Sequence, residues 1–284
     1  MLITEKNLYI GQKDYSSATK YGLLGIPYDC TASFRPGSRF APNAIRSVSE
    51  SIETYSPRLD RDLEDLCYTD FGNVPCIFGD PVKNLNIISK YHKEIISKKI
   101  FLLGIGGEHL VTYPLVKNIC ETLKNKKLTV VDFDAHLDMR EDYLGNSFSH
   151  ATVMNLISKE KNVEKIIQIG TRSGTREEYK KRANSKKIKS IETPAQLDDL
   201  LKQAELVYLT IDIDVLDPSI MPGTGTPEAG GLTYNQLLDF LYVIKNFKVI
   251  GADLVELAPE YDFSGNSSVL AAKLLREILL TVGK

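Results

Sequence analysis

The chain has 284 residues, 43% of them hydrophobic and 25% charged, and 35 basic against 37 acidic side chains give it a formal net charge of −2. This composition is typical of a globular protein, and the balanced charge lacks the basic excess with which proteins hold nucleic-acid phosphates. No apolar run approaches the ~20 residues that cross a bilayer, so we expect neither nucleic acid nor membrane as a partner.

Short runs rich in Val, Ile and Leu alternate along the chain with segments of helical spacing. Six runs are predicted strands: Tyr21–Pro27, Ile100–Gly104, Leu128–Phe133, Ile166–Gly170, Val207–Ile213 and Val249–Leu257. Five segments space apolar residues three and four apart, as amphipathic helices do: Leu85–Ser97, Tyr113–Lys124, Pro194–Ala204, Thr233–Lys245 and Ser268–Thr281. Thr233 is the predicted amino-terminal cap of its helix, with Gln236 in the capping-box position. This alternation predicts an α/β fold with a parallel sheet.

Nothing in the sequence marks an internal boundary, because we find no repeat, low-complexity tract or Pro/Ser-rich linker. We therefore predict one domain over residues 1–284, a size that α/β folds commonly reach. The charged run Arg172–Lys189 could be a basic binding patch, but Glu177 and Glu178 interrupt it, and we interpret it as a solvated helix.

The cysteines and the amino terminus predict a cytoplasmic location. Cys30, Cys67, Cys76 and Cys120 lie far apart, without the spacing of a zinc knot or the density of a disulfide scaffold, so we expect free thiols. A signal peptide needs an uninterrupted apolar core, whereas this amino terminus carries the charged residues Glu5, Lys6, Lys13 and Asp14.

Two acidic motifs stand at the ends of predicted strands and indicate a metal centre. Asp134, His136 and Asp138 are spaced two residues apart, as are Asp212 and Asp214, and such residues project to one side of an extended segment. With His109 they supply four carboxylates and two imidazoles, which favour Mn²⁺ over thiolate-bound zinc. Parallel sheets bind ligands beyond the carboxyl ends of their strands, where both motifs and Gly104-Ile-Gly-Gly-Glu-His109 lie.

Any single aspartate here could instead be a helix cap or a surface charge. Asp217, before Pro218, is interpreted as such a turn residue. We leave Asp132 out of the ligand set because we expect it on the opposite side of its strand. The combination favours a metal site, since clustered carboxylates between apolar segments need compensating cations.

Two adjacent divalent ions lower the pKa of a water between them and activate it as a nucleophile, so metal-assisted hydrolysis is the predicted reaction class. The glycines at 104, 106 and 107 are not followed by a Gly-Lys-Ser/Thr or a complete Gly-x-Gly-x-x-Gly pattern. We expect them to let the backbone turn sharply so that His109 enters the site.

The ordered motifs resemble those of the ureohydrolases, the arginase and agmatinase superfamily. The resemblance rests on four segments: Gly106-Gly-Glu-His109, Asp134-Ala-His-Leu-Asp138, Thr210-Ile-Asp-Ile-Asp-Val-Leu-Asp-Pro218 and Val255-Glu256. The segments Gly25–Asp29, Ser33–Arg39, Pro42–Arg46 and Gly223–Gly231 resemble agmatinases in particular. The family implies a three-layer α-β-α arginase-like fold around a parallel sheet of roughly eight strands.

The resemblance also implies roles for the site residues. His109, Asp134, Asp138 and Asp212 would hold one Mn²⁺, and Asp134, His136, Asp212 and Asp214 the other. Asp138 would in addition orient the attacking hydroxide, and Glu256 would pair with the guanidinium of the substrate. His150, in Ser149-His-Ala151, would shuttle protons, whereas His92 has no such context and is interpreted as structural or exposed.

The implied substrate is agmatine, split into putrescine and urea with two Mn²⁺ ions per subunit. Arginases carry an Asn-containing segment after Asp138 that reads the amino-acid head group, whereas this chain has Met139-Arg-Glu-Asp-Tyr-Leu-Gly-Asn146. Alternative substrates are arginine, guanidinobutyrate or formiminoglutamate, and a non-enzymatic alternative is a silent metal-binding regulatory subunit. Arg140 and Glu141 are interpreted as surface ion-pair residues, with shaping of substrate entry as the alternative. The family further suggests a homotrimer or homohexamer.

Overall fold

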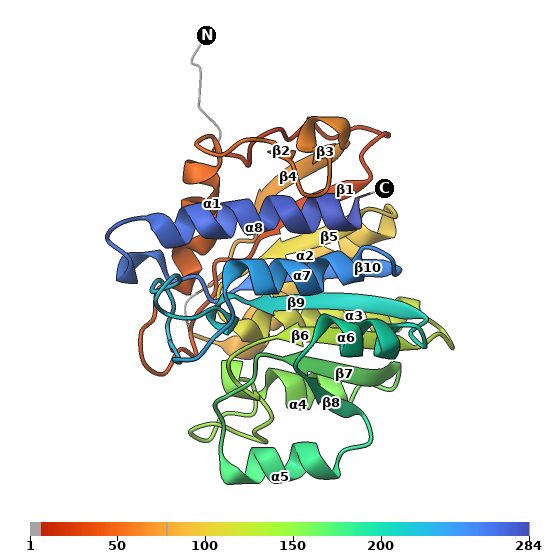
Figure 1. Cartoon of the computed structure of the whole chain (residues 1–284), viewed down its shortest axis with the longest axis vertical. Helices are drawn as coiled ribbons and strands as arrows, with labels where there is room; N and C mark the ends of the chain where they lie inside the picture. Colours follow the sequence, from red (N-terminus) through yellow and green to blue (C-terminus); the bar gives the residue numbers. More distant parts are fainter. Residues whose placement is uncertain (1–6, 78, 284) are drawn as a thin grey trace.

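In the computed structural model, which describes residues 7–77 and 79–283, eight parallel strands form one sheet (Figure 1). Their order across the sheet is β4 (Tyr68–Asn73), β1 (Tyr21–Gly25), β5 (Phe101–Ile105), β10 (Val249–Val255), β9 (Leu206–Asp212), β6 (Leu128–Phe133), β7 (Val163–Ile169) and β8 (Ile188–Ile191). The predicted parallel α/β sheet is confirmed. Glu5 and Lys6 of the charged amino terminus lie outside the described residues.

The pattern of apolar runs missed the two strands at the edges of the sheet. β4 ends in exposed or half-buried residues, and β8 exposes Lys189 and Ser190 between two buried isoleucines. An edge strand that is open to solvent lacks the continuous apolar run of a central parallel strand, so its sequence signal is weak. A separate antiparallel pair, β2 (Tyr55–Ser56) and β3 (Arg61–Asp62), was also not predicted.

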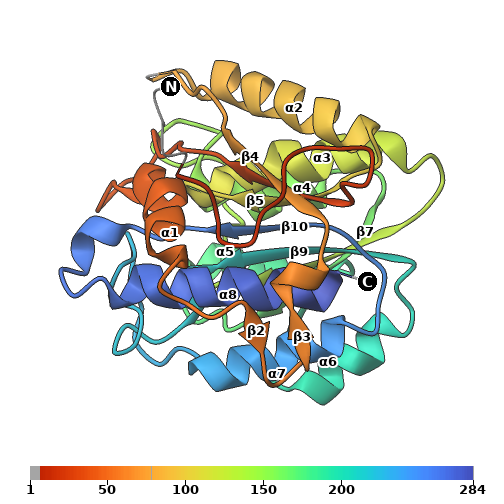
Figure 2. The ribbon, with the colours of Figure 1, turned by 90° about the horizontal axis from the view of Figure 1, so that it is seen from above.

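Helices cover both faces of the sheet, which gives three layers (Figure 2). One face carries α1 (Ala41–Ser49), α6 (Pro194–Leu201), α7 (Tyr234–Ile244) and α8 (Asn266–Val282), and the other carries α2 (Pro81–Ser97), α3 (Thr112–Thr122) and α4 (Val153–Ser158). α5 (Arg176–Asn184) lies at the β8 edge. The predicted cap of α7 is confirmed, because Gln236 N–H donates to Thr233 Oγ1 and Gln236 Oε1 accepts from Thr233 N–H.

Successive residues of the central strands point to opposite faces, and both faces are buried. In β6, Val131 and Phe133 pack with the cluster under α7 and α8, whereas Val130 packs with the cluster under α3. Two-sided burial explains why the central strands appear in the sequence as unbroken apolar runs. Within the described ranges, no helix combines the length and the apolar character needed to cross a membrane.

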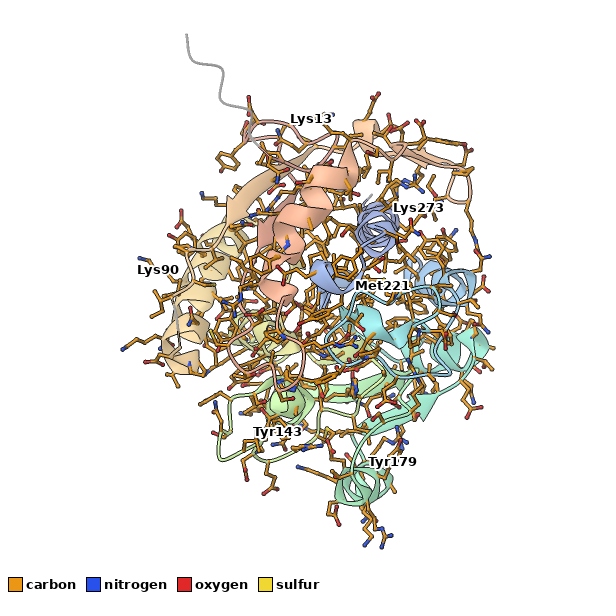
Figure 3. The ribbon with its side chains drawn as sticks, turned by 90° about the vertical axis from the view of Figure 1, so that its left-hand side faces the viewer. Lys13, Lys90, Tyr143, Tyr179, Met221 and Lys273 are labelled. Carbon is orange, nitrogen blue, oxygen red and sulfur yellow. The ribbon has the colours of Figure 1, made fainter. Side chains whose placement is uncertain are left out.

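The segments that follow β5, β10, β9 and β6 share one side of the molecule, because these four strands are neighbours and run parallel. In Figure 1 the connecting segments gather at the left, and Figure 3 looks onto that side, with Tyr143 labelled in the segment that follows β6. The residues with predicted chemistry therefore come together at the carboxyl edge of the sheet.

Candidate active site

His109 enters the site from the segment after β5, two residues after Gly107. A Cβ on Gly107 would lie 1.8 Å from the backbone oxygen of Tyr28, so only glycine allows the two segments to pass at this distance. The His109 ring is buried, and its Nδ1 lies 3.0 Å from Asp134 Oδ2, 3.3 Å from Asp138 Oδ2 and 3.5 Å from Asp212 Oδ2. These four side chains form the first cluster.

A second cluster shares Asp134 with the first. His136 Nδ1 lies 3.0 Å from Asp214 Oδ2 and 3.4 Å from Asp134 Oδ1, and Thr226 Oγ1 donates to Asp214 Oδ2 over 3.3 Å. The structure thus brings all six predicted ligands together, in two groups joined through Asp134.

The geometry that brings them together differs from the predicted extended segments. β6 ends at Phe133, the chain bends at Ala135, and Asp138 has a left-handed φ of 50°. After Asp212 the chain forms the 3₁₀ turn Ile213–Val215, in which Asp214 N–H donates to Asp212 Oδ1 over 3.0 Å. The predicted two-residue periodicity is therefore wrong for both motifs, since turns rather than strands make the carboxylates converge.

The expected position of Asp132 is also wrong. Positions 132 and 134 are two apart and so share a face of the chain, and Asp132 Oδ1 lies 3.9 Å from His109 Nε2. The buried Asp132 accepts a hydrogen bond from Gln168 Nε2, and together with His109 and Asp134 it forms a group that could hold a cation. Asp132 lies beside the first cluster, on the Nε2 side of the His109 ring.

The buried carboxylates of the two clusters favour the binding of cations. Burial, together with neighbouring carboxylates, raises the pKa of Asp138 to about 7 and that of Asp212 well above its ordinary value. Burial opposes protonation of His109, yet the hydrogen bonds that its ring donates to Asp134 and Asp138 raise the pKa of the imidazole. Four carboxylates that repel each other and two imidazoles, all oxygen or nitrogen donors, fit a pair of hard or borderline divalent ions.

The far nitrogen of His109 is held by residues that the sequence did not indicate. Nε2 lies 3.1 Å from Thr210 Oγ1, and this hydroxyl donates to Asp253 Oδ1 over 2.6 Å. Asp253 also accepts from Tyr208 Oη over 2.6 Å. Such a chain of buried partners fixes the ring orientation of a ligating histidine. Thr210 lies two residues before Asp212, and period-2 counting along β9 would have found it. Asp253 is paired with Thr210 only through the neighbouring strand β10, and no local pattern marks it.

His150 lies at the start of a 3₁₀ turn opposite the clusters. Its backbone N–H donates to Thr31 Oγ1, and its Nδ1 lies 3.3 Å from the same hydroxyl. Thr31 is in turn fixed by the buried Glu108, which accepts from Thr31 N over 2.7 Å and from Oγ1 over 2.6 Å. Burial, reinforced by the neighbouring His136, lowers the pKa of His150 to about 4. No sequence signal links Thr31 to a histidine 119 positions away.

Glu256 follows β10 with a left-handed φ of 65°, and its Oε1 accepts from His109 N over 2.7 Å. Burial, followed by repulsion from Glu108, raises the pKa of Glu256 well above its ordinary value. A cavity of about 220 Å³ opens between these residues. Five predicted site residues line it: His136, Asp138, His150, Asp212 and Glu256.

The segment after Asp138 and helix α5 close the same cavity. Arg140, Tyr143 and Glu178 line it, with Arg140 Nε 3.5 Å from Glu178 Oε2 and its guanidinium 4.5 Å from the centre of the Tyr143 ring. Arg140 therefore shapes the cavity, and its ion pair is only partly exposed. Glu141 lies 3.7 Å from Lys181 at the surface.

The remaining predictions have mixed outcomes. Asp217 is confirmed as a turn residue, since it accepts from the N–H groups of Ser219, Gly230 and Gly231. His92 is buried against Asn118, and all four cysteines are free. The solvated helix predicted for Arg172–Lys189 is wrong in part, because Glu178 of α5 is buried.

Comparisons with known proteins identify the family of this chain. Residues 19–281 match the model of the Arginase family. The agmatinase of Bacillus subtilis is 44% identical over 91% of this chain and 90% of its own length, and the guanidinobutyrase of Pseudomonas aeruginosa is 32% identical over 90% and 84%. The crystal structure of the agmatine ureohydrolase of Thermoplasma volcanium superposes with a TM-score of 0.87 at 28% identity, covering 99% of this chain and 95% of that one. This chain belongs to the arginase family of hydrolases.

Proposed function

We propose that this enzyme hydrolyses agmatine to putrescine and urea. The observation that carries the proposal is one cavity that is lined by members of both His/Asp clusters together with His150 and Glu256. A guanidinium that enters the cavity meets carboxylates on one side and a histidine on the other. The 44% identical agmatinase of Bacillus subtilis supports agmatine as the substrate.

In this proposal the chain's own residues position the substrate and move its protons. Glu256, fixed by the His109 N–H, pairs with the planar guanidinium. His150, oriented by Thr31, transfers a proton to the leaving amine. Two divalent ions held by the clusters, Mn²⁺ by the chemistry of the donors, would activate the attacking water. Asp138, the ligand nearest to His109 after Asp134, would orient this nucleophile.

The substrate is tested by release of urea from agmatine, arginine, guanidinobutyrate and formiminoglutamate after loading with Mn²⁺. We expect the highest kcat/KM for agmatine. Preference for another guanidino compound would overturn the substrate assignment alone, whereas no urea from any of them would overturn the proposed reaction. A silent regulatory subunit would bind metal and show no turnover.

We further propose that residues 1–284 act as one domain in the cytoplasm, assembled as a homotrimer or homohexamer. The single domain is supported by the sheet, because its strands come from positions between residue 21 and residue 255. Light scattering of the purified protein measures the assembly, and a monomeric mass would refute it.

A further inference from the structure

Asp138 has a backbone conformation that its sequence does not favour. Its φ of 50° lies in the left-handed region, which costs a non-glycine residue about 1 kcal/mol. This conformation directs the carboxylate back toward His109, 3.3 Å away. Contacts elsewhere in the fold must therefore hold the residue in place.

The peptide groups that follow the Asp138 side chain are held by hydrogen bonds. Its carbonyl accepts from the N–H groups of Met154 and Asn155, over 3.1 and 3.2 Å. The next residue, Met139, donates its N–H to Glu178 Oε1 over 2.9 Å and accepts from Lys181 Nζ at its carbonyl over 3.2 Å. Both polar groups of the Met139 backbone are thus held by side chains of α5.

Glu178 and Lys181 are themselves fixed. Glu178 Oε2 accepts from Thr175 N and Oγ1, over 2.9 and 3.0 Å, as part of the capping box that begins α5. Lys181 Nζ also donates to Asn155 Oδ1 over 2.7 Å, which ties α5 to α4. Figure 3 shows α5, with Tyr179 labelled, at the end of the molecule below the Tyr143 segment. Glu178 and Lys181 therefore connect α5 to the segment that carries the Asp138 carboxylate.

We infer that Glu178 and Lys181 are positioning residues that set the direction of the Asp138 carboxylate and so the affinity for one of the two metal ions. The inference rests on the proposed function, in which Asp138 is a ligand. Neither side chain has to touch the substrate for this role, because both act through the Met139 peptide.

The test compares Glu178→Ala and Lys181→Met with two matched controls on the same helix, Glu177→Ala and Lys180→Met, whose side chains are exposed. Bound Mn²⁺ is titrated with the free ion buffered, and the coupled pair is followed by electron paramagnetic resonance. Partners that orient ligands contribute about 10- to 100-fold to metal affinity. We expect a loss of this size for one ion in the two variants, with growth of a mononuclear signal, and parental behaviour in the controls.

Hydrogen exchange at the Met139 amide gives a readout that needs neither metal nor activity. We expect faster exchange in Glu178→Ala than in Glu177→Ala, and Lys181→Arg should recover most of the affinity lost in Lys181→Met because it restores a donor. Thr175→Val removes the hydroxyl that donates to Glu178 Oε2 and leaves the bond from Met139 N–H to Glu178 in place, so we expect a smaller loss of metal affinity than in Glu178→Ala.

The inference would be overturned if Glu178→Ala kept the metal affinity and the Met139 exchange rate of the parent. It would also be overturned if Glu178→Ala raised KM and changed nothing else, because Glu178 would then be a substrate contact. If the parent chain binds no Mn²⁺, the proposed function fails, and the exchange comparison still decides whether Glu178 holds the Met139 peptide.

Discussion

At the scale of single residues, Asp134 is the carboxylate that joins the two clusters, and Asp212 links the first cluster to Asp214 of the second. Asp134 lies within 3.4 Å of both His109 and His136, and Asp212 lies near His109 while it accepts from Asp214 N–H. In the proposed centre both would bridge the two ions. Removing a bridging carboxylate should therefore reduce metal content and activity more than removing a carboxylate that binds one ion only.

Asp212→Ala is expected to lose both ions and to reduce urea release by more than about a thousandfold, because the ions supply the nucleophile. Metal content by mass spectrometry and the urea assay measure the two effects. Asp199→Ala, at an exposed position on α6, is the control and should keep both. Retention of two ions by Asp212→Ala would contradict the bridging role.

His150→Ala should lower kcat by about 10²- to 10⁴-fold, the usual contribution of a proton-transferring group, and leave the metal content near that of the parent. The reason is that His150 contacts Thr31 and Tyr143 rather than the clustered carboxylates. Loss of metal in this variant would show that His150 is part of the metal centre instead.

At the scale of elements, close passage of loops decides where the catalytic side chains lie. The segments after β1 and β5 touch at Tyr28 and Gly107, and this contact places Glu108 beside Thr31. The hydrogen bonds from Gly107 N to Ile26 O and from Glu108 N to Tyr28 O align the two segments. The ends of two strands are in this way fixed to each other.

Gly107→Ala should destabilise the protein by on the order of 3 kcal/mol, because the new methyl group overlaps backbone that cannot rotate away. Gly145→Ala provides a matched comparison. Nothing lies within 4 Å of its Cβ position, so only the cost of its φ of 79°, about 1 kcal/mol, remains. Denaturant unfolding measures both, and similar losses in the two variants would refute the steric explanation.

Sequence periodicity predicted the central elements well and the site geometry less well. Runs such as Leu128–Phe133 are apolar on both faces because helices cover both sides, and this burial leaves a clear signal. Asp138 and Asp214 carry no comparable signal, since their directions come from a left-handed residue and a 3₁₀ turn. Thr31, Glu178 and Asp253 were missed because their roles arise from contacts with distant segments.

At the scale of the whole molecule, His92 couples stability to pH. Burial lowers its pKa to about 3, against ~6.5 in an unfolded chain, so only the unfolded state takes up a proton between these values. The stability contributed by the neutral, buried His92 is therefore fully present above pH ~6.5. It is lost progressively as the pH falls toward 3.

Protonation of His92 in the unfolded state should lower the free energy of unfolding by about 2 kcal/mol at pH 5. We expect His92→Gln, which keeps a polar partner for Asn118, to lose less of its free energy of unfolding between pH 7 and pH 5 than the parent does. Urea unfolding at both pH values gives the difference. Equal losses in the two proteins would mean that His92 is not the titrating group.

The strand order has a consequence for synthesis of the chain. Of the strands in residues 7–77 and 79–283, β10 is synthesised last, yet it lies between β5 and β9 in the sheet. Until residues 249–255 emerge, the nascent chain exposes two unpaired inner edges, each able to pair with another polypeptide. A ribosome that stalls before this point leaves two half-sheets, with His109 on one and the other five predicted ligands on the other, so protection by a chaperone matters most until residues 249–255 have emerged.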